Sequence, residues 1–399
     1  MLAITGGRLL SAGQAPFPGA VLVNGSTIVA AGKQATIPSG AEVIDAGGGY
    51  VAPGFVDVHV HGGAGADFMD GTPEAVRTVC RFHASGGTTG LLATTAAAPI
   101  DQLLCALDAI AAVRSEGTGG AAILGVHLEG PYFAPTKHGC HLPGQVRFPR
   151  PDEYLRLLDA HPGLVRWVTL APEIDGALDL IAALGERGIV ASAGHTEAAE
   201  PQIRAAMGAG LRHATHLYCA MSTITKRGPE RIPGLVETAL AEDGLTTEVI
   251  ADGYHLAPAL LRIAARAKGP ERLLLVTDAM RGAGMPDGTY TFGPRDGSLA
   301  IVENGVARTP DNTGFASSTA RANDLVRNMV ELAGCSLVEA AQMASATPAA
   351  ALGLAGRKGR LAPGYDADVV VLDERLDVRA TIVGGAVVYR AGGWGSVRV

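Results

Sequence analysis

Residues 56–61 read Val-Asp-Val-His-Val-His, an apolar strand pattern that carries two histidines two positions apart. Because side chains alternate between the two faces of a β-strand, His59 and His61 lie on the same face. Neutral imidazole is a common ligand of zinc and iron, so this face is one half of a metal site if it points into a pocket. A pair of hydrogen-bonded histidines at the end of a strand is the alternative interpretation.

This strand is the first of a series of short apolar segments that alternate with alanine-rich helical segments, a pattern typical of β-α units around a parallel sheet. We predict eight strands, at 55–59, 88–94, 123–129, 165–171, 188–194, 212–216, 248–252 and 273–277. We predict helices at 72–85, 101–115, 175–187, 197–209, 256–268, 320–333 and 336–346. Eight parallel strands close a (β/α)8 TIM barrel. An open doubly wound sheet is the competing architecture, but no G-x-G-x-x-G follows the first strand, and polar residues cluster at the carboxyl ends of the strands.

The two ends of the chain differ from the middle. Residues 21–30 place β-branched stretches around Asn24-Gly25, and residues 380–389 place apolar strands around a Gly-Gly turn. Because both ends are β-rich and the barrel lies between them, we expect the ends to pair into a small β-sandwich domain. The expected domains are 1–54 plus 355–399 for the sandwich, and 55–354 for the barrel.

Composition and charge exclude several classes of protein. With 399 residues, 47% of them hydrophobic, the chain buries a large core. Five scattered cysteines with no C-x-x-C spacing indicate a reducing compartment, so we expect a cytoplasmic protein. We find no secretion signal and no apolar run of the roughly 20 residues that a membrane span needs. The net charge of −7 disfavours nucleic acid and leaves a small molecule as the expected partner.

Four further polar residues follow predicted strands: Glu129, His195, His216 and Asp278. A barrel brings the carboxyl ends of its strands to one mouth, so these side chains are expected to meet His59 and His61 there. Taken singly, each histidine could be a core residue and Asp278 a solvated loop residue. His127, two positions before Glu129, is interpreted as a packed or outer-sphere histidine rather than a ligand.

Such a cage of imidazole and carboxylate suits hydrolysis at a carbonyl. A bound cation lowers the pKa of coordinated water from about 15.7 to about 7 and polarises the carbonyl. A nearby carboxylate that shuttles the proton contributes roughly 100- to 10,000-fold in rate. Asp278 fits that role.

Several motifs together resemble the amidohydrolase superfamily, and within it the deacetylases of N-acetylglucosamine 6-phosphate. The resemblance covers nearly the whole chain and rests on residues 53–62, 127–132, 137–141, 194–196, 215–221, 250–255, 277–280 and 359–372. It implies a (β/α)8 barrel with a small β-sandwich, a divalent metal site and a homodimer. The implied cofactor is one or two ions per subunit, with Zn²⁺ or Fe²⁺ expected first and Mn²⁺ or Co²⁺ as alternatives.

The resemblance also assigns roles by position. Glu129, His195 and His216 would bind the principal metal. His59 and His61 can hold a second ion, bridged by the glutamate, so two ions are allowed rather than required. Asp278 corresponds to the catalytic acid and base.

The substrate residues follow from the same resemblance. His141 matches the histidine that orients or polarises the acetyl carbonyl. His255 matches one that contacts the sugar phosphate from the opposing subunit, or the sugar itself. Cys219 replaces the family's asparagine, although the backbone N–H groups of Cys219 and Ala220 remain as donors.

The loop at residues 222–234 is longer than in the family and carries two candidate arginines for the phosphate, Arg227 and Arg231. Arg231 is favoured because Arg-Ile-Pro-Gly best matches the family's R-E-P-G. Arginine suits phosphate because its planar fork makes two charge-assisted hydrogen bonds. Both arginines could equally be solvated surface charges. Residues 315–319 match the family only in part.

The expected reaction is hydrolysis of the acetamide of N-acetylglucosamine 6-phosphate to glucosamine 6-phosphate and acetate. A galacto-configured sugar, an unphosphorylated sugar and another N-acyl compound are alternatives within the same chemistry. A non-catalytic metal-binding relative is the alternative from a different class, and the intact set of metal and acid-base residues argues against it.

Overall fold

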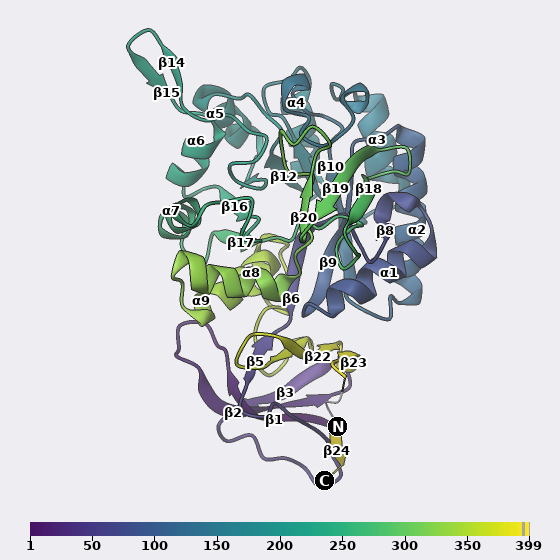
Figure 1. Cartoon of the computed structure of the whole chain (residues 1–399), viewed down its shortest axis with the longest axis vertical. Coiled ribbons are helices and arrows are strands. Elements are labelled where there is room, and N and C mark those ends of the chain that lie inside the picture. The colour runs from purple at the N-terminus through teal and green to yellow at the C-terminus, as the bar shows by residue number, and fades with distance from the viewer. Residues whose placement is uncertain (393–395, 399) are drawn as a thin grey trace.

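The computed structural model describes residues 1–392 and 396–398. Its larger part is a barrel of parallel strands surrounded by helices, and a smaller β-domain that contains the N-terminus lies below it (Figure 1). In spatial order the barrel strands are β6 (Phe55–Val60), β9 (Thr88–Thr95), β10 (Ala122–Glu129), β11 (Val165–Leu170), β12 (Val190–Ala193), β13 (His213–Ala214), β16 (Thr246–Val249) and β17 (Leu273–Leu275). Their spatial order follows the chain without a reversal, which confirms the barrel and excludes the doubly wound sheet.

The first and last barrel strands, β6 and β17, do not pair as a β-ladder. Backbone hydrogen bonds between the end of β6 and the loop that follows β17 join them instead. The N–H of Asp278 donates to the carbonyl of His59 at 2.8 Å, and the N–H of His61 donates to the carbonyl of Ala279 at 2.9 Å. At the same seam the Asp57 carboxylate accepts hydrogen bonds from the backbone N–H and the hydroxyl of Thr277. The seam therefore holds both strand-one histidines beside Asp278.

Most outer helices lie where the sequence predicts them. These are α1 (Pro73–Ala84), α2 (Ile100–Glu116), α4 (Ala177–Glu186), α5 (Glu200–Ala209) and α7 (Pro258–Lys268). The predicted helix 320–333 is α8 (Ala322–Asn328) followed by a π-helical turn (Met329–Ala333), and the helix predicted at 336–346 is α9 (Leu337–Met343). Three short α-helices among the described residues were not predicted: α3 (Pro151–Ala160), α6 (Leu235–Ala241) and α10 (Ala346–Ala351).

Helix α1 shows why these segments are helical. The Thr72 hydroxyl caps its first turn by accepting from the N–H of Ala75 at 3.3 Å, and Pro73 occupies the first helical position, where no donor is needed. Val76, Val79 and other buried residues repeat at three- and four-residue spacing and face the barrel. Burial of each such aliphatic side chain contributes about 1.5–3 kcal/mol.

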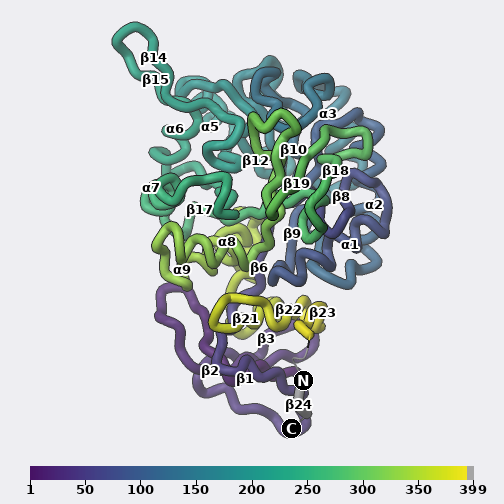
Figure 2. The backbone as a smooth tube through the Cα atoms, in the orientation of Figure 1, coloured from purple at the N-terminus to yellow at the C-terminus, as the bar shows by residue number. Residues whose placement is uncertain are grey.

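Three small antiparallel β-structures lie outside the β-α repeat. A three-stranded antiparallel sheet, β18 (Gly288–Phe292), β19 (Ser298–Glu303) and β20 (Val306–Arg308), lies between β17 and α8. A hairpin of β14 (Thr225–Arg227) and β15 (Glu230–Ile232) extends well beyond the rest of the molecule (Figures 1 and 2). A third, minimal pair is β7 (Gly62–Gly63) with β8 (Ala66–Asp67), next to a 3₁₀ turn at Phe68–Asp70.

Both chain termini build the small domain, as expected. Its strands are β1 (Leu2–Leu9), β2 (Phe17–Asn24), β3 (Thr27–Gly32), β4 (Glu42–Asp45), β5 (Tyr50–Pro53), β21 (Val369–Leu372), β22 (Val378–Val383), β23 (Ala386–Arg390) and β24 (Ser396–Arg398). They form one mixed sheet, in which β1 pairs with β2, β4 and β5 and so joins its parts. Its core includes Ile4, Val21, Ile44, Val369 and Ile382. The Gly384-Gly385 turn has positive φ at both residues, which suits a tight hairpin. We propose domain boundaries close to residues 54 and 355.

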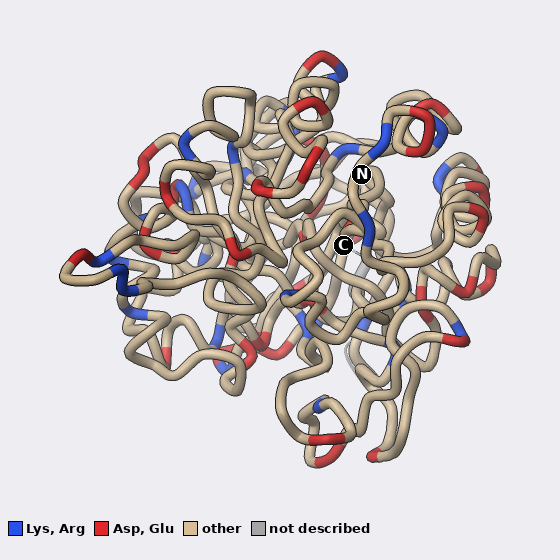
Figure 3. The backbone as a smooth tube through the Cα atoms, turned by 90° about the horizontal axis from the view of Figure 1, so that it is seen from above, with Lys and Arg blue, Asp and Glu red and all other residues tan. Residues whose placement is uncertain are grey.

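Surface charge is mixed over the described residues. Basic and acidic positions are interspersed in the view from above, without a basic face (Figure 3). No helix among the described residues is both long and apolar enough to span a membrane.

Candidate metal centre and active site

The mouth of the barrel gathers the polar residues that follow its strands. Oε1 of Glu129 lies 3.1 Å from Nε2 of His195 and 3.2 Å from Nε2 of His216. Oε2 of the same carboxylate lies 3.2 Å from Nε2 of His61. Glu129, at the end of β10, therefore stands between histidines that come from three different strands or strand ends.

The strand-one histidines share a second carboxylate. Oδ1 of Asp278 lies 3.2 Å from Nε2 of His61 and 3.6 Å from Nε2 of His59. Nε2 of His59 also lies 3.4 Å from Oε1 of Glu129. The six residues predicted to form the cage are thus all brought together.

Backbone strain at the strand ends directs several of these side chains. His195, His216 and Asp278 have φ values of 50°, 24° and 45°, a region that non-glycine residues rarely adopt. Such residues cost about 1–3 kcal/mol each and persist where the surrounding structure holds them. Each lies in the turn that leaves a barrel strand, so the strain is concentrated at the mouth.

The atoms around Glu129 Oε1 fit a cation. Nδ1 of His195 lies 2.7 Å from the carbonyl of Lys137, so Nδ1 carries the proton and Nε2 presents a lone pair. Burial lowers the pKa of His195 to about 4, which keeps the ring neutral. Nε2 of His216 lies 3.1 Å from Nε2 of His195, beside the carboxylate oxygen. Convergence of lone pairs and a carboxylate on one point is the arrangement of a divalent metal site.

The deeper subsite also demands positive charge. His59 and His61 are fully buried, and Nε2 of each faces carboxylate oxygens at 3.2–3.6 Å without a well-aligned hydrogen bond. Burial alone would lower the pKa of His61, but Asp278 and Glu129 raise it to about 9. Two sets of three ligand atoms, each within 4.8 Å of one another, are suited to a metal: His59, His61 and Glu129, and Glu129, His141 and His195.

The tautomer of His141 argues against a ligand role for it. The N–H of Ala97 donates to Nδ1 of His141 at 3.1 Å, so in the neutral ring Nε2 carries the proton. Nε2 accordingly donates toward Oε2 of Glu129 at 3.1 Å. His141 is therefore a hydrogen-bond donor at the edge of the metal cluster.

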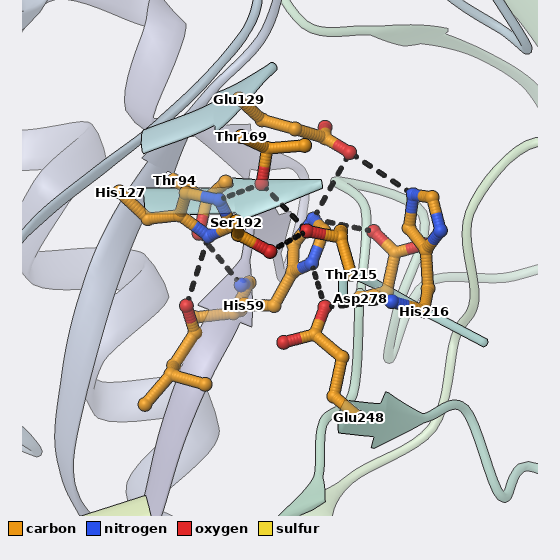
Figure 4. A network of polar contacts seen from close by, with 12 residues as sticks. His59, Thr94, His127, Glu129, Thr169, Ser192, Thr215, His216, Glu248 and Asp278 are labelled. Atoms are coloured by element: carbon orange, nitrogen blue, oxygen red, sulfur yellow. Dashed lines mark hydrogen bonds and ion pairs between the residues drawn. The ribbon is translucent and has the colours of Figure 1, made fainter. Parts of the chain in front are cut away.

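A network of polar residues flanks the centre on one side (Figure 4). His127 donates from Nδ1 to the carbonyl of Val58 at 3.0 Å, and its Nε2 accepts from the hydroxyl of Thr169 at 2.7 Å. Thr169 in turn contacts Thr215 at 2.8 Å. Burial lowers the pKa of His127 well below its usual value, so the ring is neutral. Both ring nitrogens are occupied, and His127 presents no lone pair to the centre.

Above the centre lies a pocket of about 480 Å³. Its floor contains Glu129, His195, His216 and Asp278, and its walls include His141, Cys219, Ala220, His255, Phe292 and Phe315. A pocket of this volume can hold a small sugar derivative.

His255 is held in this wall from two sides. Oδ2 of Asp252 lies 2.8 Å from Nδ1 of His255, and the ring of Phe315 lies 4.4 Å away between centroids. With Nδ1 engaged by the carboxylate, the Nε2 side of the ring remains for a ligand.

One expectation about Cys219 is wrong. Its backbone N–H donates to the carbonyl of His216 at 3.0 Å, so this group is already used within the turn. Burial raises the pKa of its thiol to about 12, so the side chain is neutral. Cys219 lines the pocket as a small, weakly polar wall, and Ala220 beside it adopts φ 45°.

The family model for the amidohydrolase family matches residues 50–388. The chain belongs to this family. N-acetylglucosamine-6-phosphate deacetylase of Bacillus subtilis (strain 168) is 36% identical over 379 residues, which cover 92% of this chain and 94% of that protein. N-acetylgalactosamine-6-phosphate deacetylase of Escherichia coli O157:H7 is 39% identical over 335 residues, which cover 84% and 86%.

A solved structure extends the similarity to the whole fold. It is a mutant N-acetyl-D-glucosamine-6-phosphate deacetylase from Mycobacterium smegmatis in complex with N-acetyl-D-glucosamine-6-phosphate. It superposes with a TM-score of 0.89 at 39% identity and covers 97% of this chain and 99% of that chain.

The two candidate phosphate arginines of this amidohydrolase do not reach its own pocket. Arg227 ends β14 and Arg231 lies in β15, both exposed on the protruding hairpin and absent from the pocket lining. Arg231 donates to the carbonyl of Pro229 at 3.1 Å, which turns it back onto the hairpin. In this structure neither arginine lies against the pocket of its own chain.

Three residues of the site were missed by sequence reasoning. Glu248 contacts His59, Ser317 contacts Asp278, and Asp252 contacts His255. Asp252 follows a predicted strand, and that position was a usable signal. Glu248 was placed at the start of a predicted strand, and Ser317 lies in a loop whose match to the family was partial, so neither carried a signal.

Proposed function

We propose that this amidohydrolase hydrolyses the acetamide of N-acetylglucosamine 6-phosphate to glucosamine 6-phosphate and acetate. The observation that carries the proposal is the convergence of Glu129, His195 and His216 on one point at the floor of a sugar-sized pocket. Relatives with this activity, similar over most of their length, support the substrate class.

We infer that Glu129, His195 and His216 would hold the principal ion, and that His59 and His61, together with Glu129, would hold a second ion. A bound divalent cation supplies Lewis-acid chemistry, making water acidic enough to attack at neutral pH and polarising the carbonyl. Imidazole and carboxylate ligands suit Zn²⁺ or Fe²⁺ first, and also Mn²⁺ or Co²⁺.

Asp278 is the proposed proton carrier. Burial raises its pKa, but His59 and His61 outweigh burial and lower it to about 2, so the carboxylate is ionised and able to accept a proton. As the water oxygen bonds to the acetyl carbon, Asp278 takes the water's proton. It then delivers this proton to the nitrogen as the C–N bond breaks, and the sugar leaves as a free amine.

His141 is the proposed donor to the acetyl carbonyl. Its Nε2 carries the proton because the N–H of Ala97 occupies Nδ1. Substrate binding would redirect this donor from Glu129 to the carbonyl oxygen, where negative charge develops in the transition state.

Recognition of the phosphate is proposed to require a homodimer. His255 lines the pocket of its own subunit, whereas Arg227 and Arg231 lie on the hairpin that extends away from it. We infer that the hairpin reaches the pocket of a second copy, and that Arg227 is the better candidate because Arg231 is bonded within the hairpin. The five free cysteines support a cytoplasmic enzyme.

A substrate panel tests the proposal. We expect kcat/KM to be highest for N-acetylglucosamine 6-phosphate and lower for the unphosphorylated sugar. The galacto-configured phosphate is the second candidate, because a relative at 39% identity acts on it and because Cys219 removes a side-chain amide from the pocket wall. Equal kcat/KM values for N-acetylglucosamine and N-acetylglucosamine 6-phosphate would contradict the proposal that the substrate is phosphorylated.

A further inference from the structure

Glu248 is a fully buried carboxylate in the barrel strand β16. It does not line the pocket, so it does not contact the substrate. An ionised carboxylate in such a place is costly unless its oxygens are hydrogen-bonded. The partners of Glu248 therefore indicate what keeps it there.

One oxygen of Glu248 contacts residues of both proposed ion subsites. Oε1 lies 2.6 Å from Nδ1 of His59, and it accepts the backbone N–H of His216 at 3.1 Å. His59 belongs to the deeper subsite and His216 to the subsite that faces the pocket. A single atom thus connects the two sets of ligands (Figure 4).

The other oxygen is satisfied by a histidine that faces away from the centre. Oε2 lies 3.2 Å from Nε2 of His213, whose Nδ1 lies 2.7 Å from the hydroxyl of Thr246. Because an ionised carboxylate can only accept a hydrogen bond, Nε2 of His213 carries the proton and donates to Oε2. His213 therefore fixes the rotation of the Glu248 carboxylate and keeps Oε1 turned to His59.

The contact to His59 determines which nitrogen faces the centre. A proton held on Nδ1 by the carboxylate leaves the lone pair of Nε2 directed at Glu129 and Asp278. The contact to His216 is different, because it anchors the backbone of a residue strained at φ 24°. Loss of that bond would free the strained turn to relax and move the imidazole.

We propose that Glu248 is a positioning residue that orients His59 and anchors His216 simultaneously, so that one carboxylate sets the geometry of both ion subsites. This inference rests on the proposed function only in taking His59 and His216 as metal ligands. It does not depend on which sugar is the substrate. The competing explanation is that Glu248 only accepts a hydrogen bond from His213 and stabilises the barrel.

Metal affinity of the apoprotein separates these explanations. We expect Glu248→Gln, which keeps the shape and removes the charge, to weaken Zn²⁺ binding about 10- to 100-fold at both subsites, measured by competition with a chromophoric chelator. Glu248→Ala should weaken it further. Co²⁺ substitution provides a second readout, because altered ligand geometry changes the visible absorption spectrum.

A buried charge outside the centre provides the matched control. Lys268, on α7, donates to the carbonyls of Ala239 and Glu242 and contacts no proposed ligand. Lys268→Met should lower the melting temperature and leave Zn²⁺ affinity unchanged. Zn²⁺ affinity within twofold of wild type in Glu248→Gln at both subsites would overturn the proposal. Weaker binding at one subsite only would also overturn it.

A measurement on the wild-type protein covers the case in which the variants do not fold. In ¹⁵N-histidine-labelled zinc protein we expect a downfield Nδ1–H proton assigned to His59 by its absence in His59→Asn. A His59 protonated at Nε2 would overturn the proposal. If the protein binds zinc with these properties but hydrolyses no N-acetyl sugar, the proposed function fails and the role of Glu248 stands.

Discussion

The hydroxyl of Ser317 donates a hydrogen bond of 2.8 Å to Oδ1 of Asp278. The N–H of Ser318 also donates to the backbone carbonyl of Asp278, at 2.8 Å. Both serines follow the antiparallel sheet inserted after the last barrel strand. The orientation of the proposed catalytic carboxylate is therefore set by an insertion and not by the barrel alone.

Replacement of Asp278 by asparagine should remove proton transfer. We expect kcat for Asp278→Asn to fall about 100- to 10,000-fold. The ion held by Glu129, His195 and His216 should remain, since Asp278 does not contact that subsite's nitrogens. Elemental analysis beside steady-state kinetics checks both points, and an unchanged kcat would exclude Asp278 as the proton carrier.

Ser317→Ala should leave Asp278 ionised but less well oriented. Because a hydrogen bond to a charged group contributes about 1.5–3 kcal/mol, we expect kcat to fall at least about tenfold with little change in KM. Ser336→Ala is the control, because this serine caps α9 far from the site. The control should reduce stability by about 0.5–2 kcal/mol and leave kcat intact. Equal kinetic effects in the two variants would contradict the assignment.

Glu129→Gln should lower the content of both ions, because the Glu129 carboxylate lies 3.1–3.4 Å from histidines of both proposed subsites. His195→Asn should lower only the content of the principal ion. Metal-to-protein ratios after dialysis against a fixed free Zn²⁺ concentration measure this difference. Wild-type ratios in either variant would remove that residue from the ligand set.

Hybrid dimers test whether the hairpin acts on the partner subunit. Arg227→Ala and Asp278→Asn proteins are each expected to be poorly active on the phosphorylated substrate. Random exchange of subunits should restore up to about a quarter of wild-type activity, because half of the dimers are hybrid and each hybrid has one intact site. If subunit exchange is demonstrated but activity does not recover, Arg227 acts on the site of its own subunit. Arg231→Ala tested in the same way separates the two arginines.

His83 predicts a pH dependence of stability. It is fully buried on α1, its Nε2 donates to the carbonyl of Gly62, and burial lowers its pKa from 6.5 to about 4. Between pH 6.5 and pH 4 His83 is protonated in the unfolded chain but stays neutral in the native protein. The free energy of unfolding therefore falls as the pH falls toward 4. The expected loss between pH 7 and pH 5 is about 2 kcal/mol.

Urea unfolding of metal-free protein measures this slope. Glutamine at position 83 can still donate to Gly62 but does not titrate, so His83→Gln should lose about 2 kcal/mol less than wild type over the same interval. Parallel pH profiles for the two proteins would show that His83 does not contribute.

The barrel was predictable because a buried parallel strand and an amphipathic helix each have a local pattern. All eight predicted strands are present, and Glu129, His195 and His216 were found because each follows a strand. Glu248 was not found, because the seventh strand was predicted at 248–252 whereas β16 is Thr246–Val249. That shift of about two residues placed the carboxylate at the wrong end of its strand. The sheet β18–β20 and the hairpin β14–β15 were missed because insertions do not follow the barrel's repeat.

The sequence by itself determined the class of fold and pointed to the proposed metal-binding side chains, since both depend on periodicity and on residue type along short segments. Only the tertiary structure decided how those side chains are oriented. The proton on Nδ1 of His59, the donor on Nε2 of His141 and the rotation of Asp278 are set by Glu248, Ala97 and Ser317, which lie far from them in the chain. Hydrogen bonds between distant segments exist only once the barrel has closed, and no local pattern contains them.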